Sequence, residues 1–141
     1  MYRDKKNRWY LITQVERGTR CYVSWRVAAE RDSATLQAVV NAAPAAQQYY
    51  SDALPAYDAL VYYPGHHQSL PNKSQTYAVE ADNAELRHYL ARLARRSRCF
   101  SRSEEALHDA VKVFIFAWNR RQLARRAHPQ YSAPVRDFVY P

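Results

Sequence analysis

Two carboxylates, Asp52 and Glu80, are the side chains of this 141-residue sequence best placed to do chemistry. Asp52 ends a predicted short strand, and Glu80 opens the helix that leads into the most basic stretch of the chain. Carboxylate oxygens suit Mg²⁺ or Mn²⁺, and two such ions about 4 Å apart can activate an attacking oxygen and stabilise a leaving one. Arginines beside the acids would hold phosphates. If the two acids converge, metal-dependent phosphoryl transfer is the chemistry that they predict.

The spacing alone also allows a simpler role for Glu80. Counted at 100° per residue, Glu80 lies about 20° from Arg87, on the basic side of the helix. An acid in the first turn also complements the helix dipole, which is worth at most about 1 kcal/mol. Capping and metal binding therefore both stay open at this point. Asp58 and Asp82 are predicted to be surface or capping groups, with Asp82 close enough to Glu80 to be an alternative ligand.

Positive charge is concentrated in the last third of the chain. The net charge is +8, yet residues 1–86 hold nine Lys or Arg and nine Asp or Glu, whereas residues 87–141 hold twelve and four. A localised excess of this kind is typical of proteins that bind a polyanion, because neutralised phosphates release counterions. A basic surface that is only solvated is the alternative interpretation.

Membrane and secretory segments are not indicated. No apolar run approaches the roughly 20 residues that span a bilayer, and the N-terminal stretch lacks the apolar centre of a signal peptide. We therefore expect a cytoplasmic protein with no membrane partner. Cys21 and Cys99 form no CxxC pattern, which excludes a disulfide framework and a structural zinc site. The length fits one domain, residues 1–141.

The N-terminal part predicts a β-hairpin. Residues 8–15 and 20–27 each alternate apolar and polar side chains, and a short segment with Gly18 separates them. In the second strand, Val23 is expected to share a face with Trp25 and Val27, opposite Tyr22. Cys21 is expected to be a core thiol on the face of Val23.

The rest of the chain predicts helices alternating with short strands. A helix is expected from Asp32 or Ser33 to a stop at Pro44, and a strand that ends at Ser51 and Asp52 precedes a small helix from Pro55 to Leu60. Residues 62–75 are predicted to be a loop, in which His66 and His67 are solvated. A possible last strand covers residues 76–80. Such an α/β layer binds ligands at the carboxyl ends of its strands.

Two helices are predicted after Glu80. The first carries Leu86, Tyr89, Leu90 and Leu93 on one stripe and arginines on the opposite half. The second starts near Ser103, with acids in its first turn, and ends before Pro129. It forms a helical C-terminal extension.

Three segments carry a family resemblance: "SDALPAY", the pattern K-x-x-T-x-x-x-E-x-x-N-x-x-L-R at residues 73–87, and "RLARRSRCFSRS". Together with the N-terminal hairpin they resemble the catalytic half of transposases of the insertion sequence 1 family (InsB type). The resemblance implies an α/β fold with a ribonuclease H-like mixed sheet flanked by helices. It also implies a bacterial DDE recombinase, in which three acids bind two Mg²⁺ or Mn²⁺ ions for DNA strand cleavage and transfer.

The resemblance assigns roles residue by residue. Asp52 corresponds to the second acid and Glu80 to the third, and both would bind metal. Its implied partners are the insertion-sequence ends and target DNA, a homo-oligomer on DNA, and a nucleoid-associated location. DNA contacts or support are expected from Lys73, Asn83, Arg87, Arg92, Arg95, Arg96, Arg98 and Arg102, with Thr76 beside them.

The first acid departs from the family pattern. The hairpin turn reads Glu16-Arg17 where relatives have Asp-Arg, and their further Asp-Glu-x-Trp stretch would precede Met1. A ribonuclease H-like sheet starts with three antiparallel strands, whereas two are predicted here. The hypothesis is an N-terminally truncated domain whose first strand, first acid and DNA-recognition module come from an upstream frame.

Glu16 is the candidate first acid within this sequence. Its side chain is one methylene longer than aspartate, and a misplacement near 1 Å can cost about a hundredfold in rate. The alternative function is therefore a catalytically incomplete DNA-binding remnant of a transposase. A third interpretation, a basic structural or RNA-associated protein, would leave Asp52 and Glu80 far apart.

Overall fold

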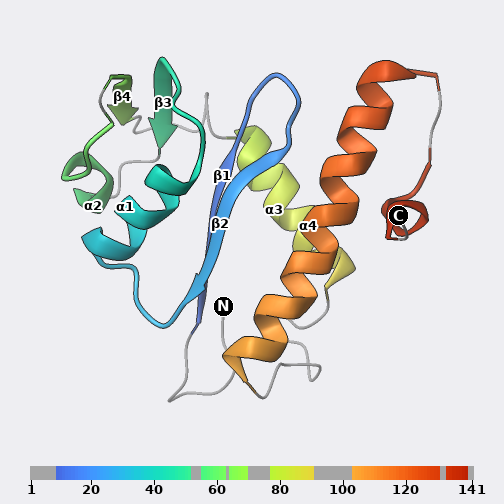
Figure 1. Ribbon diagram of the computed structural model, residues 1–141, viewed down its shortest axis with the longest axis horizontal. Coiled ribbons are helices and arrows are strands. Elements are labelled where there is room, and N and C mark those ends of the chain that lie inside the picture. Colours follow the sequence, from blue (N-terminus) through green and yellow to red (C-terminus); the bar gives the residue numbers. More distant parts are fainter. Residues whose placement is uncertain are drawn as a thin grey trace.

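The structure is a computed structural model that describes residues 9–51, 55–62, 64–69, 77–90, 103–130 and 133–139, without the side chains of residues 77–79. It combines helices with short strands (Figure 1). The elements in chain order are β1 (Tyr10–Val15), β2 (Tyr22–Ala28), α1 (Ser33–Ala42), β3 (Gln48–Ser51), α2 (Pro55–Asp58), β4 (His66–Ser69), α3 (Tyr77–Tyr89), α4 (Glu104–Ala127) and the 3-10 helix η2 (Val135–Phe138).

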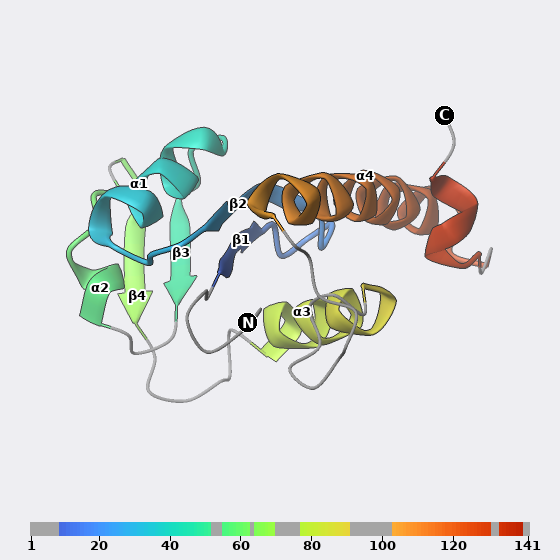
Figure 2. The same ribbon diagram turned by 90° about the horizontal axis from the view of Figure 1, so that it is seen from below.

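The antiparallel hairpin β1–β2 is the central layer. It separates α1, α2, β3 and β4 on one side from α3 and α4 on the other (Figures 1 and 2). Two apolar clusters follow from the alternation of its side chains. Ile12 packs with Leu36, Val39 and Leu60 on the α1 side. On the other side, Tyr22 and Val27 of β2 pack with Leu86 of α3 and with the apolar stripe of α4, including Trp118.

A β-bulge changes the expected alternation in β2. Gln14 pairs with Ser24, but the next residue, Val15, pairs with Tyr22, so the register shifts between these pairs. A bulge of this kind moves side chains from one face to the other. The prediction that Tyr22 faces away from Val27 is therefore wrong, because both lie in the cluster with α4.

The two helices with the clearest sequence signals, α1 and α4, form as predicted. The Asp32 side chain caps α1 by accepting a hydrogen bond from the Thr35 backbone N–H at 2.8 Å, and the helix ends at Ala42, before Pro44. Ser103 caps α4 in the same way through the Ala106 N–H at 3.1 Å. That helix ends at Ala127, as expected from Pro129.

Two predictions for the middle of the chain are wrong. His66–Ser69, expected within a loop, is strand β4, which pairs in parallel with β3. Its polar sequence carries no local strand signal, so only the tertiary pairing with β3 makes it a strand. Residues 77–80, expected as a strand, form the first turn of α3. Periodicity does not separate strand from helix in so short an apolar run.

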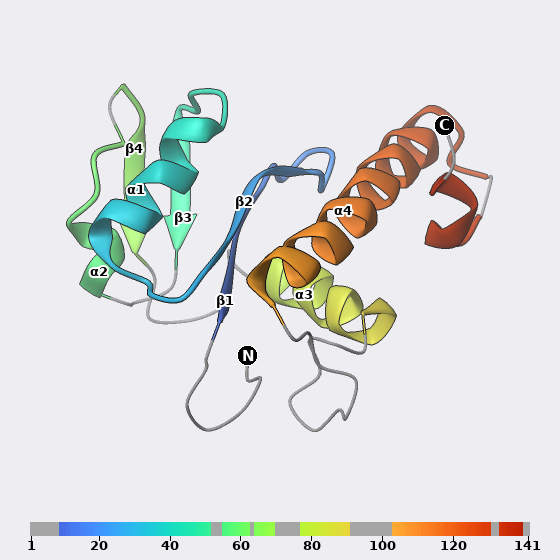
Figure 3. The same ribbon diagram turned by 60° about the horizontal axis from the view of Figure 1, so that its bottom comes forward.

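Antiparallel and parallel pairs are both present, as in a mixed sheet, but they form two separate two-stranded sheets within the described ranges. The sequence pattern indicated β1, β2 and β3 as strands but not β4, and it did not indicate which sheets they join. Both β3 and β4 run toward the side of the molecule where α3 lies (Figures 2 and 3). Among the helices that the structure describes, none is long and apolar enough to cross a membrane.

Candidate functional site

The turn of the β1–β2 hairpin carries Glu16, the candidate first acid. Its carboxylate accepts hydrogen bonds from the backbone N–H groups of Gly18 and Thr19, both at 2.7 Å, and from the Thr19 hydroxyl at 2.6 Å. The Thr19 hydroxyl and these backbone groups lower the pKa of Glu16. Glu16 is exposed and acts as a charged cap of its own turn. Its catalytic role stays a prediction.

Arg20 leaves this turn in a strained backbone conformation. Its φ is 60°, in the left-handed region that costs a non-glycine residue roughly 1–2 kcal/mol. Two contacts hold it there: its N–H donates to the Glu16 carbonyl at 2.8 Å, and its carbonyl accepts from the Trp118 indole N–H at 3.1 Å. The guanidinium then points to α3.

Arg20 binds Asp82 of α3 through two hydrogen bonds. Nη2 donates to Oδ1, and Nε donates to Oδ2 at 3.3 Å, a fork that matches the carboxylate. The Asp82 side chain is 2% exposed, whereas that of Arg20 is 44% exposed. Burial raises the pKa of Asp82, and the Arg20 contacts oppose this rise.

The expectation that Asp82 is a surface or capping group is therefore wrong. A signal was present in the sequence, because Asp82 stands four and eight residues before Leu86 and Leu90, on the apolar stripe of α3. An acid on an apolar stripe is buried only when a partner neutralises it. That partner, Arg20, is 62 positions away in the chain.

Asn83, an expected DNA contact or support residue, faces the hairpin. Its side-chain oxygen accepts from the Tyr22 hydroxyl at 3.2 Å and from the Thr13 hydroxyl at 3.4 Å. Burial is the main cause that raises the pKa of Tyr22, so its hydroxyl stays protonated and able to donate at neutral pH. These contacts tie α3 to both strands of the hairpin.

Helix α4 also holds the hairpin, through the side chain of Asn119. The Asn119 amide oxygen accepts from the Tyr22 backbone N–H at 2.8 Å, and its NH₂ donates to the Tyr22 carbonyl at 2.9 Å. One side chain thus satisfies both backbone groups of Tyr22, as a neighbouring strand would. Cys21, buried as predicted, lies next to this contact.

Glu80 lies in the first turn of α3 and is exposed, as is Arg87 near the last turn. Glu80 stands three residues before Asn83, so the two share a face of the helix, and Asn83 contacts Thr13 of β1. The first turn of α3 is the end of the helix nearer to β3 and β4 (Figures 2 and 3). The place of Glu80 relative to the end of β3 stays a prediction.

The hairpin turn also reaches β3. The Arg17 guanidinium carbon lies 5.0 Å from the centroid of the Tyr50 ring, within range of a cation–π contact. Tyr50 stands two positions before Asp52 in the sequence. One turn, with Glu16 at its start, thus contacts β3 through Arg17 and α3 through Arg20.

The predicted site residues divide into two groups. Glu16, Glu80, Asn83 and Arg87 lie among the residues that the structure describes. Among all the residues that the structure describes, no cluster of three or more His, Cys, Asp or Glu side chains could hold a metal ion. The predicted site residues outside the described ranges are Asp52, Lys73, Arg92, Arg95, Arg96, Arg98 and Arg102.

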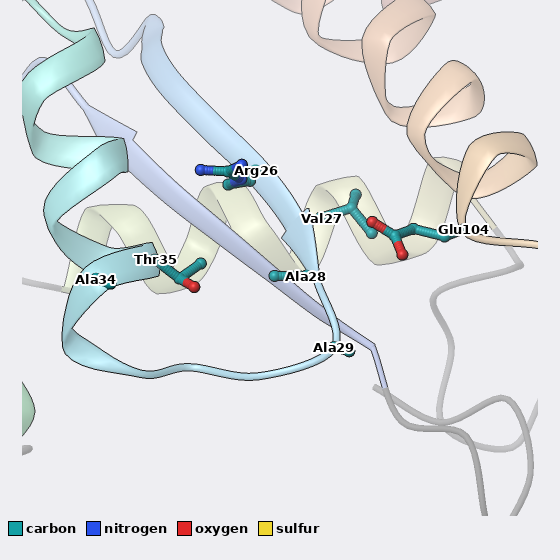
Figure 4. A pocket seen from close by; sticks show the side chains of 7 residues that line it. All are labelled: Arg26, Val27, Ala28, Ala29, Ala34, Thr35 and Glu104. Atoms are coloured by element: carbon teal, nitrogen blue, oxygen red, sulfur yellow. The ribbon is translucent and has the colours of Figure 1, made fainter.

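A pocket of about 320 Å³ lies at the opposite end of the hairpin, between the end of β2 and the starts of α1 and α4 (Figure 4). Arg26 and Glu104 provide its charged groups, and Thr35 its hydroxyl. None of the predicted site residues lines it. The pocket and the acid-bearing turn are therefore separate features of the fold.

Comparison with known proteins identifies the family of this chain. A family model described as IS1 transposase matches residues 2–121, a span that includes the hairpin, β3, α3 and most of α4. No curated protein and no solved structure matches the chain. The chain belongs to the IS1 transposase family, a class of enzymes that cleave and transfer DNA.

Proposed function

We propose that this chain is a DDE-type transposase catalytic domain with a ribonuclease H-like arrangement. In it, Asp52 and Glu80, with Glu16 as first acid, bind two Mg²⁺ or Mn²⁺ ions. The reaction is cleavage of the insertion-sequence ends and transfer of the resulting 3′-hydroxyl into target DNA. The family membership supports the reaction class, and the donor set of carboxylates suits these cations.

One observation carries the proposal: the turn with Glu16 contacts both elements that lead to the other two acids. Arg17 lies over Tyr50, two positions before Asp52, and two extended residues span at most about 7 Å. On the other side, α3 docks on β1 through Asn83, which shares a helix face with Glu80.

The parallel pairing of β3 and β4 supports the same conclusion. Ser51 and Ser69 are paired, so the two strands end in register at one edge. Asp52 follows the first strand, and the chain after the second leads to α3 and Glu80. Carboxyl ends of parallel strands are the usual position of ligand sites in α/β folds.

The bound ions would supply electrophilic stabilisation of the attacking and leaving oxygens. The chain's own residues would position them and the DNA. Glu16 accepts one hydrogen bond on Oε1 and two on Oε2, so a carboxylate with about four acceptor positions keeps about one open for a cation. Exposed Arg87 and the arginines that follow in the sequence would bind phosphates.

The same hydrogen bonds of Glu16 favour a second candidate function, the catalytically incomplete DNA-binding remnant. If the turn holds Glu16 as a cap and it does not bind metal, the chain binds DNA without cutting it. The two functions separate on metal, because the enzyme requires Mg²⁺ or Mn²⁺ for turnover and the remnant has no turnover to lose.

A strand-transfer assay on end-sequence DNA tests the proposal. We expect Asp52→Asn and Glu80→Gln each to lower transfer by at least about a hundredfold, since a displacement near 1 Å already costs that much. Glu85→Gln, an exposed acid on another face of α3, is the matched control and should retain activity. Full activity in Glu80→Gln would refute the proposal. DNA binding without transfer in the unmodified chain would establish the remnant.

A further inference from the structure

A hydrogen bond joins the last residue of β3 to the second residue of β4. The Ser51 hydroxyl and the His67 Nε2 are 2.7 Å apart. On the other edge of the imidazole, Nδ1 lies 3.7 Å from Oδ1 of Asp58, at the end of α2. Three elements, β3, β4 and α2, therefore meet at one histidine.

His67 is held in place by packing as well as by hydrogen bonding. Its ring stacks on Tyr62, with centroids 4.3 Å apart and planes 13° from parallel. Tyr62 is fixed in turn by the bond from its hydroxyl to the Tyr57 carbonyl at 3.0 Å. The His67 side chain is only 11% exposed, so the prediction of a solvated loop histidine is wrong.

The surroundings favour a neutral imidazole in one tautomer. Burial lowers the pKa of His67, and the Asp58 carboxylate opposes this less strongly. With the proton on Nδ1, which faces that carboxylate, Nε2 accepts from the Ser51 hydroxyl. His67 is therefore an acceptor directed at the last described residue of β3.

A serine, a histidine and an aspartate in this order also form the chain that activates a nucleophilic serine. Here Asp58 is 60% exposed and stands beyond hydrogen-bond distance of the ring, so its hold on the imidazole is weak. Ser51 instead directly precedes Asp52 in the sequence. The contact is better suited to fixing the strand end than to attacking a substrate.

We propose that His67 is a positioning residue, which fixes Ser51 and thereby the direction in which the chain enters Asp52. This inference rests on the proposed function, because it assigns His67 to the geometry of the same metal site. It predicts that the Ser51–His67 bond affects turnover while leaving DNA affinity unchanged. The bond would act through the next residue in the sequence, Asp52, to which the proposed function assigns the metal.

His67→Phe is the informative variant, because phenylalanine keeps the stacking on Tyr62 and removes the acceptor. Together with Ser51→Ala and the double variant it forms a double-mutant cycle. We expect each single variant to lower kcat for strand transfer by about tenfold with KM for DNA unchanged, and the double variant to be no slower than either. His67→Gln should restore part of kcat. His66→Phe, at the exposed neighbour in β4, is the control and should change nothing.

Hydrogen exchange of the peptide spanning residues 48–54 measures the coupling between Ser51 and His67 independently of catalysis. The inference predicts faster exchange in Ser51→Ala and His67→Phe and no further increase in the double variant. Unchanged exchange, or additive losses of kcat, would overturn it. Serine-dependent hydrolysis of p-nitrophenyl acetate, lost in Ser51→Ala, would overturn it in favour of a nucleophile. Coupled exchange in a chain without strand transfer would confirm the Ser51–His67 coupling, while the proposed function and the catalytic effect of that coupling would fail.

Discussion

The hairpin turn holds its two neighbours in different ways. On the α3 side, Arg20 forms a two-point ion pair with buried Asp82, and Asn83 receives hydrogen bonds from both strands. On the β3 side, the guanidinium of Arg17 lies over the ring of Tyr50. The first is a buried polar network, and the second is a cation–π contact near the surface.

This difference shows where the proposed site is preorganised. Networks in which every buried polar group has a partner fix one arrangement, because each alternative leaves a group unpaired. Helix α3, which has Glu80 in its first turn, is therefore held against the hairpin by Asp82 and Asn83. The end of β3 depends more on its own sheet, through β4 and His67. We infer that the β3 side is the more adjustable half of the proposed site.

The largest expected effect is on the buried network. Arg20→Met leaves the Asp82 carboxylate buried without its partner, and we expect a loss of about 3 kcal/mol in the free energy of unfolding at neutral pH. Urea unfolding monitored by tryptophan fluorescence measures it. Arg26→Met, at an exposed arginine of β2, is the control. A loss as small as that of the control would show that the ion pair does not anchor α3.

Asn119→Ala should rank next. It removes both partners of the Tyr22 backbone groups, and we expect about 2 kcal/mol of destabilisation from two lost hydrogen bonds. Lys112→Ala, on an exposed position of the same helix, should be neutral. Equal unfolding midpoints for the two variants would mean that α4 holds the hairpin by apolar packing alone.

The two acids of this region should respond to pH with opposite signs. The pKa of Asp82 is raised above its ordinary value of 3.8, so its contribution to stability falls as the pH rises from 3.8 through its folded pKa. The pKa of Glu16 is lowered below 4.5, so its contribution is present above pH 4.5 and is lost as the pH falls through its folded pKa.

Unfolding of Asp82→Asn and Glu16→Gln between pH 3 and pH 7 checks these signs. The stability difference between the unmodified chain and Asp82→Asn should shrink toward higher pH. The difference for Glu16→Gln should shrink toward lower pH, and it should stay well under about 1 kcal/mol because Glu16 is solvated. Parallel curves for the two variants would contradict the contrast between a buried and an exposed acid.

A similarly small effect on stability should come from Arg17→Ala. A cation–π contact near the surface is worth about 0.5–1 kcal/mol, so the unfolding midpoint should barely move. Strand transfer should fall further than this change in stability implies, because the turn loses its contact with the residues before Asp52. Arg17→Lys should recover part of the rate. Unchanged strand transfer in Arg17→Ala would show that the contact of Arg17 with Tyr50 does not contribute to the proposed site.

Local signals explain why part of the fold was predictable. The hairpin, α1 and α4 have alternating or helical patterns and clear caps at Asp32 and Ser103, and all three form as expected. Strand β4 and the start of α3 lack such signals. The bulge that turns Tyr22 toward α4 is likewise set by pairing between strands, which no single strand encodes.

The candidate acids and the contacts around them differ in what the sequence can indicate. Asp52, Glu80 and Glu16 are proposed from carboxylate chemistry and the family pattern and stay predictions, whereas no sequence pattern indicated the contacts that hold the described elements. Arg20 and Asp82 are 62 positions apart in the chain. Without knowledge of this partner, an acid shortly before an arginine-rich stretch is predicted to be a surface group. Similarly, the polar segment that contains His67 is predicted to be a loop, because its pairing with β3 is not visible in the sequence.

The account depends on Asp52 and Glu80 sharing a cation beside the hairpin turn. Replacing Mg²⁺ with Fe²⁺ and adding ascorbate and peroxide generates radicals that cut the backbone at the metal. We predict cuts near residues 52 and 80 in the same preparation, both suppressed by excess Mg²⁺ and both lost in Glu80→Gln but not in Glu85→Gln. Cutting near Asp52 that persists in Glu80→Gln, or cutting at neither acid, would contradict a shared metal site.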